Sequence, residues 1–142
     1  MTQELRNYIK STEFLAVQEA SAAVNGTIID TYIDNTAGHH QDMAMVIAGA
    51  GEFGTDIDHL NIKVLESDSA VFASSSVARG GEEVEVGEGE QNVFQIERSK
   101  RYLRITVTPV EITSPSETPG EDSFLVYATG LLTNWAVPLP LL

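Results

Sequence analysis

The feature that most constrains the fold is a period of two in the hydrophobic pattern. In residues 101–108, Leu103, Ile105 and Val107 alternate with more polar side chains, and residues 60–64 repeat this alternation. An extended strand points successive side chains to opposite faces, so alternation of this kind is typical of a half-buried β-strand. From about residue 16 onward, the period of two replaces any helical spacing.

The alternating or short apolar segments number about eight or nine, and each predicts one strand. They are residues 27–33, 43–48, 60–64, 71–73, 84–86, 93–97, 101–108 and 124–132. Clusters of Gly, Pro, Ser and Asp lie between them, as turn residues do. No helical crossover of 10–15 residues separates any two segments. The pattern therefore predicts an all-β, antiparallel protein, either a two-sheet sandwich or a barrel, and excludes a parallel βαβ fold.

The two ends of the chain differ from this central β-domain, which we place at residues 16–132. Residues 1–15 have apolar side chains at helical spacing and predict an N-terminal arm with one or two helical turns. Residues 133–142 are apolar and contain Pro138 and Pro140, which makes a central strand improbable and predicts an extended C-terminal tail.

Charge and cysteine content narrow the function classes for this chain of 142 residues. Asp and Glu number 21 against 8 Lys and Arg, which gives a net charge of −13. Nucleic acids and anionic membrane surfaces are bound through Lys and Arg, so we expect neither as a partner. The absence of cysteine removes disulfides and thiol chemistry. With no apolar run of about 20 residues and no signal-peptide pattern, we expect a soluble protein made in a cytoplasm.

Half of the basic residues lie in one short segment, which we call the basic segment. It spans residues 98–104 and contains Arg98, Lys100, Arg101 and Arg104. Two interpretations stay open for it. These side chains either pair with carboxylates of the same chain, or they form a contact between subunits, where arginine is favoured for bidentate pairing with carboxylates.

Five glutamates form an acidic segment at residues 82–90: Glu82, Glu83, Glu85, Glu88 and Glu90. Calcium would require several carboxylate oxygens, but the Asp-rich and Asn-rich spacing of a calcium loop is absent. We expect a solvated acidic hairpin, which also discourages edge-to-edge pairing of sheets.

The sequence holds weak candidates for cofactor and catalytic chemistry, and we expect neither a cofactor nor a metal. Residues 49–54 match the glycine-rich pattern of dinucleotide sites, but no helix follows to bind a pyrophosphate, so a loop between strands is expected. His39 and His40 lie in a polar loop where a metal is conceivable, and His59 lies near Asp56. No nucleophile elbow accompanies them, so we do not expect an enzyme.

Several motifs, taken in order, resemble a widespread set of small virion proteins of tailed bacteriophages. They are Asn25-Gly26-Thr27-Ile28-Ile29-Asp30-Thr31, then Leu60–Lys63 and Leu65-Glu66-Ser67-Asp68, then the stretch from Ser99 to Thr108, and finally Ala128-Thr129-Gly130. The resemblance spans about residues 16–132. The chain departs from the pattern at Ser67-Asp68-Ser69-Ala70, where an Asp-Gly turn is missing, and at Arg98, where a small residue is usual.

This resemblance implies a jelly-roll-like β-sandwich and the function of a capsid decoration, or cement, protein. Such a protein binds and stabilises the assembled capsid by bridging subunits of the major capsid protein. We therefore expect a homo-oligomer (dimer or trimer) on the capsid exterior, synthesised in the cytoplasm of the host bacterium. The alternative is a neck, tail or fibre-associated β-sandwich that recognises a glycan or another virion protein.

For either role, the candidate residues at a capsid or subunit interface are the apolar residues of the two ends and the basic segment. They are Leu5, Tyr8, Ile9, Phe14, Arg98, Lys100, Arg101, Arg104, Trp135, Leu139, Leu141 and Leu142. A glycan site would need exposed aromatic rings, for which Tyr32, Tyr102 and Trp135 are the candidates. No residue is expected to be catalytic.

Overall fold

The computed structural model describes residues 9–31, 43–116 and 118–133, and these residues form ten β-strands and no helix. Accordingly, no helix in this part of the chain could cross a membrane. The strands are β1 (Ile9–Ala20), β2 (Val24–Asn25), β3 (Ile29–Asp30), β4 (Met43–Phe53), β5 (Ile57–Ser67), β6 (Ser76–Val77), β7 (Val84–Val86), β8 (Gln91–Glu97), β9 (Tyr102–Glu111) and β10 (Phe124–Thr133).

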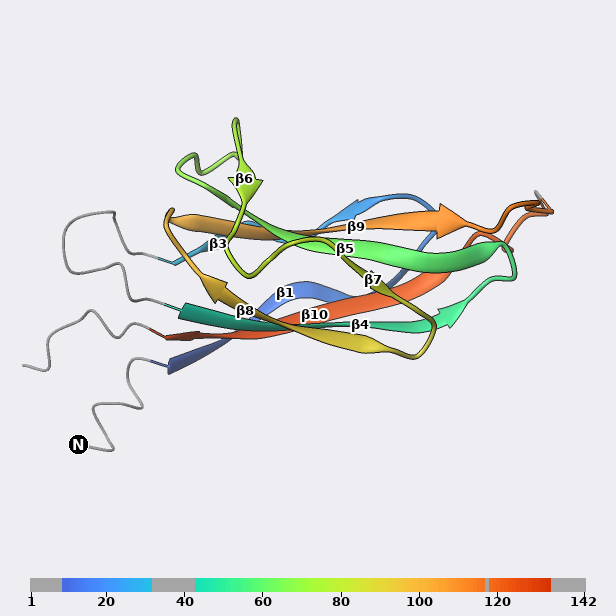
Figure 1. The fold of residues 1–142 in the computed structure, drawn as a ribbon, viewed down its shortest axis with the longest axis horizontal. Coiled ribbons are helices and arrows are strands. Elements are labelled where there is room, and N and C mark those ends of the chain that lie inside the picture. The colour runs from blue at the N-terminus through green and yellow to red at the C-terminus, as the bar shows by residue number, and fades with distance from the viewer. Residues whose placement is uncertain (1–8, 32–42, 117, 134–142) are drawn as a thin grey trace, which may run out of the picture.

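The strands form two sheets that lie face to face as two layers (Figure 1). One sheet has the order β1-β10-β4-β8, and the other has the order β2-β9-β5-β6, with β3 also pairing β9 and β7 also pairing β5. All pairs are antiparallel. The prediction of an antiparallel β-sandwich is confirmed.

The strand order is that of a jelly roll. The short strands β2 and β3 both pair β9 and together fill one strand position. In the same way, β6 and β7 both pair β5 and together fill another. Ten strands thus occupy eight positions, four in each sheet. The order β1-β10-β4-β8 against β2/β3-β9-β5-β6/β7 is the arrangement that two interlocked Greek keys produce.

The core lies between the two sheets and follows the predicted alternation. Leu60, Ile62 and Val64 of β5 are fully buried, as are the three apolar residues predicted to share one face of residues 101–108. From the other sheet, buried side chains face them: Phe14, Val46, Phe94, Ile96, Phe124 and Val126. Each large apolar side chain buried in this way contributes about 1.5–3 kcal/mol.

One side of the sandwich is closed at Gly26, where the backbone hydrogen-bonds to both sheets; we call such a link between the sheets a crossing. The Gly26 N–H donates to the Ile105 carbonyl in β9 (2.8 Å), and the next N–H donates to the Phe14 carbonyl in β1 (3.0 Å). A Cβ at residue 26 would lie 2.4 Å from the Phe14 oxygen, so only glycine fits. Asn25-Gly26 is a common turn dipeptide, but here β2 and β3 continue along β9, and the close approach of the backbone requires this glycine.

The other side is closed by residues 78–81, which link β5 to β8. The Ala78 N–H donates to the Val64 carbonyl (3.0 Å), and the Glu97 N–H of β8 donates to the Arg79 carbonyl (2.9 Å). Gly80 has a φ of +90°, and a Cβ there would lie 1.9 Å from the Gln95 carbonyl oxygen. This crossing therefore also depends on glycine.

The predicted helical arm is wrong for residues 9–15, which form the first half of β1. Ile9 to Glu13 pair in register with Thr133 to Thr129 of β10. A helix of one or two turns is marginal by itself, whereas pairing with β10 satisfies backbone groups along the whole segment. A register shift between Glu13 and Leu15 turns the neighbours Phe14 and Leu15 both into the core. Residues 1–8 and 134–142 lie outside the described residues.

The strand predicted at residues 71–73 is also wrong. Phe72 has a φ of 51°, and the Ser69 hydroxyl accepts hydrogen bonds from the N–H groups of Val71 (3.3 Å) and Ala73 (3.2 Å). Local bonding to a serine side chain thus replaces sheet pairing here. The predicted strand at 27–33 is likewise reduced to β3, and its last two residues lie outside the described part of the chain.

We predict that Gly80→Ala destabilises the sandwich more than Gly120→Ala does. Both glycines have a φ near +90°, but nothing lies within 4 Å of a Cβ at Gly120. The Gly120 change should cost about 1–2 kcal/mol for the left-handed backbone alone. The Gly80 change should cost about 1–3 kcal/mol more, because the Gln95 carbonyl must move. Urea unfolding measures both, and equal losses would contradict the proposed crossing.

Candidate functional site

The two outer faces of the sandwich differ in chemistry. On the outer face of the β9-containing sheet, the outward positions of β5 include His59, Asn61 and Lys63, and those of β9 include Arg104 and Thr106. This is the polar, solvated outer face that antiparallel sheets commonly have. It does not indicate an apolar partner.

The outer face of the β1-β10-β4-β8 sheet is instead apolar at its centre. Residues that alternate with the buried core positions of β4, β8 and β10 point outward there. We call the following set the apolar face: Met45, Ile47, Val93, Leu125, Tyr127 and Leu131. Cross-strand register places Leu131 beside Met45 and Val93 beside Ile47. Met45, Val93 and Leu131 are 41 %, 49 % and 44 % exposed, which leaves apolar area for a partner.

The glycine-rich motif belongs to this face and not to a nucleotide loop. Gly49 and Gly51 lie inside β4, so the expected loop between strands is wrong as well. Gly49 is the register partner of Tyr127, whose ring occupies the space that a Cβ at 49 would need. Gly51 is similarly overlain by Leu125. The glycines thus allow two large side chains to lie flat on the sheet.

At one end of this sheet, the chain enters or leaves four neighbouring strands, and we call these strand ends the row of chain exits. Cross-strand pairing places Ile9 beside Thr133, Thr133 beside Met43, and Met43 beside Glu97. The chain therefore enters β1, leaves β10 and enters β4 from adjacent positions, so residues 1–8, 32–42 and 134–142 all connect to this row. At about 4.8 Å between strands, the row is about 15 Å wide. We call this end of the sandwich the exit end.

The structure places the predicted interface residues in three groups. Leu5, Tyr8, Trp135, Leu139, Leu141 and Leu142 lie outside the described residues. Ile9 begins β1 in the row of chain exits. Phe14 is fully buried against Gly130, and it is therefore a core residue that no partner can reach in this fold.

The basic segment lies at the exit end, between the end of β8 and the start of β9. Arg101 forms a bidentate pair with Asp30, with Nε–Oδ1 and Nη2–Oδ2 distances of 2.8 Å each. Arg98 is buried and donates from Nη1 to the Lys100 carbonyl (3.0 Å). The interpretation that basic side chains pair with carboxylates of the same chain is thus confirmed for Arg101.

The other two cations of the segment make different contacts. The Arg104 guanidinium lies over the Phe72 ring, 4.8 Å from its centroid. Lys100 Nζ donates to the Ser76 hydroxyl (3.3 Å). Ser99, which directly precedes Lys100, donates from its N–H and its hydroxyl to the buried carboxylate of Glu66 (2.9 and 2.6 Å). These bonds fix the segment against β5.

The opposite end of the sandwich is acidic. The acidic segment crosses from β7 in one sheet to β8 in the other, so the predicted hairpin is wrong, but all five glutamates are exposed. The Glu88 carboxylate accepts the Phe53 N–H at the end of β4 (2.8 Å), and Glu90 accepts the Gly87 N–H (2.7 Å). These carboxylates order the crossover itself.

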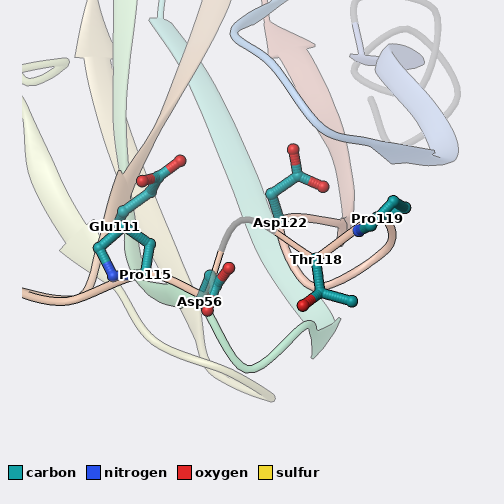
Figure 2. A pocket seen from close by; sticks show the side chains of 6 residues that line it. All are labelled: Asp56, Glu111, Pro115, Thr118, Pro119 and Asp122. Atoms are coloured by element: carbon teal, nitrogen blue, oxygen red, sulfur yellow. The ribbon is translucent and has the colours of Figure 1, made fainter.

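A hollow of about 290 Å³ opens at this acidic end (Figure 2). Figure 2 shows Glu111 from the end of β9, Asp56 from the β4–β5 connection, and Thr118 and Asp122 from the loop before β10. Asp56 is buried, and its two oxygens accept the N–H and hydroxyl of Ser116 (2.9 Å each). Asp56 therefore holds the loop in place.

The histidine candidates gain no catalytic arrangement from the described residues. His59 Nδ1 lies 2.6 Å from Asp58, and its Nε2 lies 3.7 Å from Glu85, while His39 and His40 lie outside the described part of the chain. Within residues 9–31, 43–116 and 118–133, no group of three or more acidic, histidine or cysteine side chains could hold a metal ion.

Comparisons with known proteins find remote likenesses only. No protein-family model matches the chain, and no curated protein is significantly similar to it. Among solved structures, it is similar to the SPBc2 prophage-derived protein YomS, with 11 % identity and a TM-score of 0.45, over 89 % of this chain and 93 % of that one. It is also similar to a chain of infectious bursal disease virus, Gx strain, with 8 % identity and a TM-score of 0.45, over 89 % of this chain and 32 % of that one.

Sequence reasoning missed the apolar face, although a signal was present. Residues 43–48 and 124–132 are apolar almost throughout and do not alternate. Such runs indicate strands that are apolar on both faces. In an antiparallel sheet at the surface, the second apolar face is available for another contact.

We predict a coupling free energy of about 0.5–1 kcal/mol between Arg101 and Asp30, the value for a well-aligned pair that is partly exposed. A double-mutant cycle with Arg101→Ala and Asp30→Ala, followed by urea unfolding, measures it. The coupling should shrink in 1 M salt, where the screening length is about 3 Å. As a control, Lys100→Ala should change stability by less than about 0.5 kcal/mol. A coupling of zero would mean that Arg101 is available to other partners.

Proposed function

We propose that this chain is a structural virion protein that binds and stabilises the assembled phage capsid as a head decoration protein, by bridging subunits of the major capsid protein. The ordered motifs at residues 16–132 support this role through their resemblance to small phage virion proteins. The jelly-roll order is compatible with it, although a fold alone does not specify a function.

The observation that carries the proposal is the lengthwise asymmetry of the sandwich. The row of chain exits, the basic segment and the near end of the apolar face lie at one end. The hollow with Asp56, Glu111 and Asp122, together with Glu88 and Glu90 of the acidic segment, lies at the other. We propose that the exit end docks and the acidic end faces solvent, where its negative charge keeps the particle soluble.

Docking at the exit end would be multivalent. Three segments that join one row about 15 Å wide can reach different neighbouring subunits, and linked weak contacts raise the apparent affinity. Trp135, Leu139, Leu141 and Leu142 are proposed contacts to the capsid or to a neighbouring copy. Each would contribute about 1.5–3 kcal/mol when buried, offset in part by the cost of ordering the segment.

We predict that purified chain, added to phage particles that lack it, binds in a fixed ratio to the major capsid protein and raises the temperature at which the heads open. Quantitative gel analysis and thermal disruption of the particles measure the two effects. Lys100→Glu at the exit end should weaken binding, and Glu111→Lys, an exposed position at the acidic end, should not.

Two results would count against a head decoration protein. Binding confined to one vertex or to the tail, at a few copies per particle, would favour the neck, tail or fibre alternative. A loss of binding on Glu111→Lys with no effect of Lys100→Glu would place the contact at the acidic end.

A further inference from the structure

The apolar face has no covering element among the described residues. The chain has a net charge of −13, but the six side chains of this face carry no charge. The outward positions of β4, β8 and β10 that lie among these six side chains are uncharged too. They are Gly49, Gly51, Gln91, Gln95 and Thr129. A surface of this kind is apolar enough to be buried, and its neighbouring charges, which include Glu13 of β1 and Glu97 of β8, lie at its borders.

The size of this face limits what can cover it. Three strands about 4.8 Å apart, over about six residues of 3.3 Å each, give an area of about 300 Å². A stable contact between two folded proteins needs about 800 Å² from each partner. The face is therefore too small to hold a folded partner alone, but it matches the strip that one extended peptide segment covers.

Residues 134–142 have the chemistry of such a segment. They are Asn134, Trp135, Ala136, Val137, Pro138, Leu139, Pro140, Leu141 and Leu142, with no charged side chain among them. The two prolines lack an N–H group and would interrupt pairing at a sheet edge. On the face of a sheet, contact is made through side chains, so the missing N–H groups of the prolines do not weaken binding.

The direction of β10 favours a neighbour's face over the chain's own as the place where residues 134–142 bind. It continues from Thr133, where β10 runs out of the sheet at the row of chain exits. Val137 and Leu139 precede prolines and are restricted to extended conformations. The segment also contains no glycine, so a full reversal within residues 134–136 would be needed to cover its own face. Extended, nine residues reach about 28 Å beyond the row.

We propose that residues 134–142 of a second copy of this chain lie across the apolar face, and that the exchange is mutual. Reciprocal exchange closes a dimer, and cyclic exchange closes a trimer. The Trp135 and leucine side chains of one copy would pack on Met45, Ile47 and Leu131 of the next. The inference concerns the free protein and does not rest on the proposed function.

The first test is the mass of the free protein in sedimentation equilibrium. The unmodified chain should be a dimer or trimer. Deletion of residues 134–142 should give a single-chain mass. Met45→Glu and Leu131→Glu should each raise the dissociation constant about tenfold or more, because a carboxylate would lose water in an apolar contact. Both side chains are exposed, so both variants should fold.

The matched control is Thr106→Glu, which adds the same charge to the outer face of the other sheet. Thr106 is an outward position of β9 that pairs with Lys63 and Asn25 in register. This variant should keep the mass of the unmodified chain. If Thr106→Glu dissociates the oligomer as strongly as Leu131→Glu does, the contact lies elsewhere and the proposal fails.

The second test mixes two variants that should each be a single chain alone. One lacks residues 134–142 but keeps the apolar face, and the other carries Met45→Glu and Leu131→Glu but keeps the segment. Exchange of the segment predicts that the mixture forms a species of two chains, because one intact face meets one intact segment.

Three results would overturn the proposal. A single-chain mass for the unmodified protein would mean that no second copy binds. An oligomer that survives deletion of 134–142 would mean that the contact is made by another surface. Failure of the two variants to associate, where the unmodified chain is an oligomer, would mean that the segment and the face do not bind each other.

Discussion

The sandwich depends on two crossings, where the backbone hydrogen-bonds to both sheets at a distance that only glycine allows. At Gly26 the chain binds β9 and β1 in successive peptide groups, and at residues 78–81 it binds β5 and β8. These crossings hold both open sides of the two layers together. Since the sides are closed, another molecule can approach only at an outer face or at one of the two ends.

Those remaining surfaces are unlike each other. One outer face is polar and the other is apolar, while one end gathers the basic segment and the chain exits and the other gathers carboxylates. The net charge of −13 is therefore concentrated away from the surfaces that we propose as contacts. The molecule can remain soluble through one end and bind through the other, which a uniformly charged chain of the same composition could not do.

The sequence was sufficient for the class of fold, because alternation is a local property. Leu60, Ile62 and Val64, which alternate in residues 60–64, lie on one buried face as the pattern predicts. It was insufficient where a residue's role depends on a distant partner. Gly49 is required because the Tyr127 ring lies over it, and β1 is extended because it pairs with β10. For the candidate site, the sequence left Arg101 open between an internal pair and a subunit contact, and it gave no sign that Phe14 is buried in the core, while the apolar face went unnoticed.

The position of β10 between β1 and β4 has a consequence for how the protein is made. Among the described strands, β1 at the start of the chain has β10 at the end as its neighbour in the sheet, so the four-stranded layer cannot be completed until residue 133 has left the ribosome. Until then β1 and β4 lack the strand that lies between them. Such long-range closure is slow, and nascent chains with exposed strands are prone to stick to one another. A protein needed in many copies at once would therefore depend on the acidity of its chain, well before any fold exists, to keep its nascent copies apart.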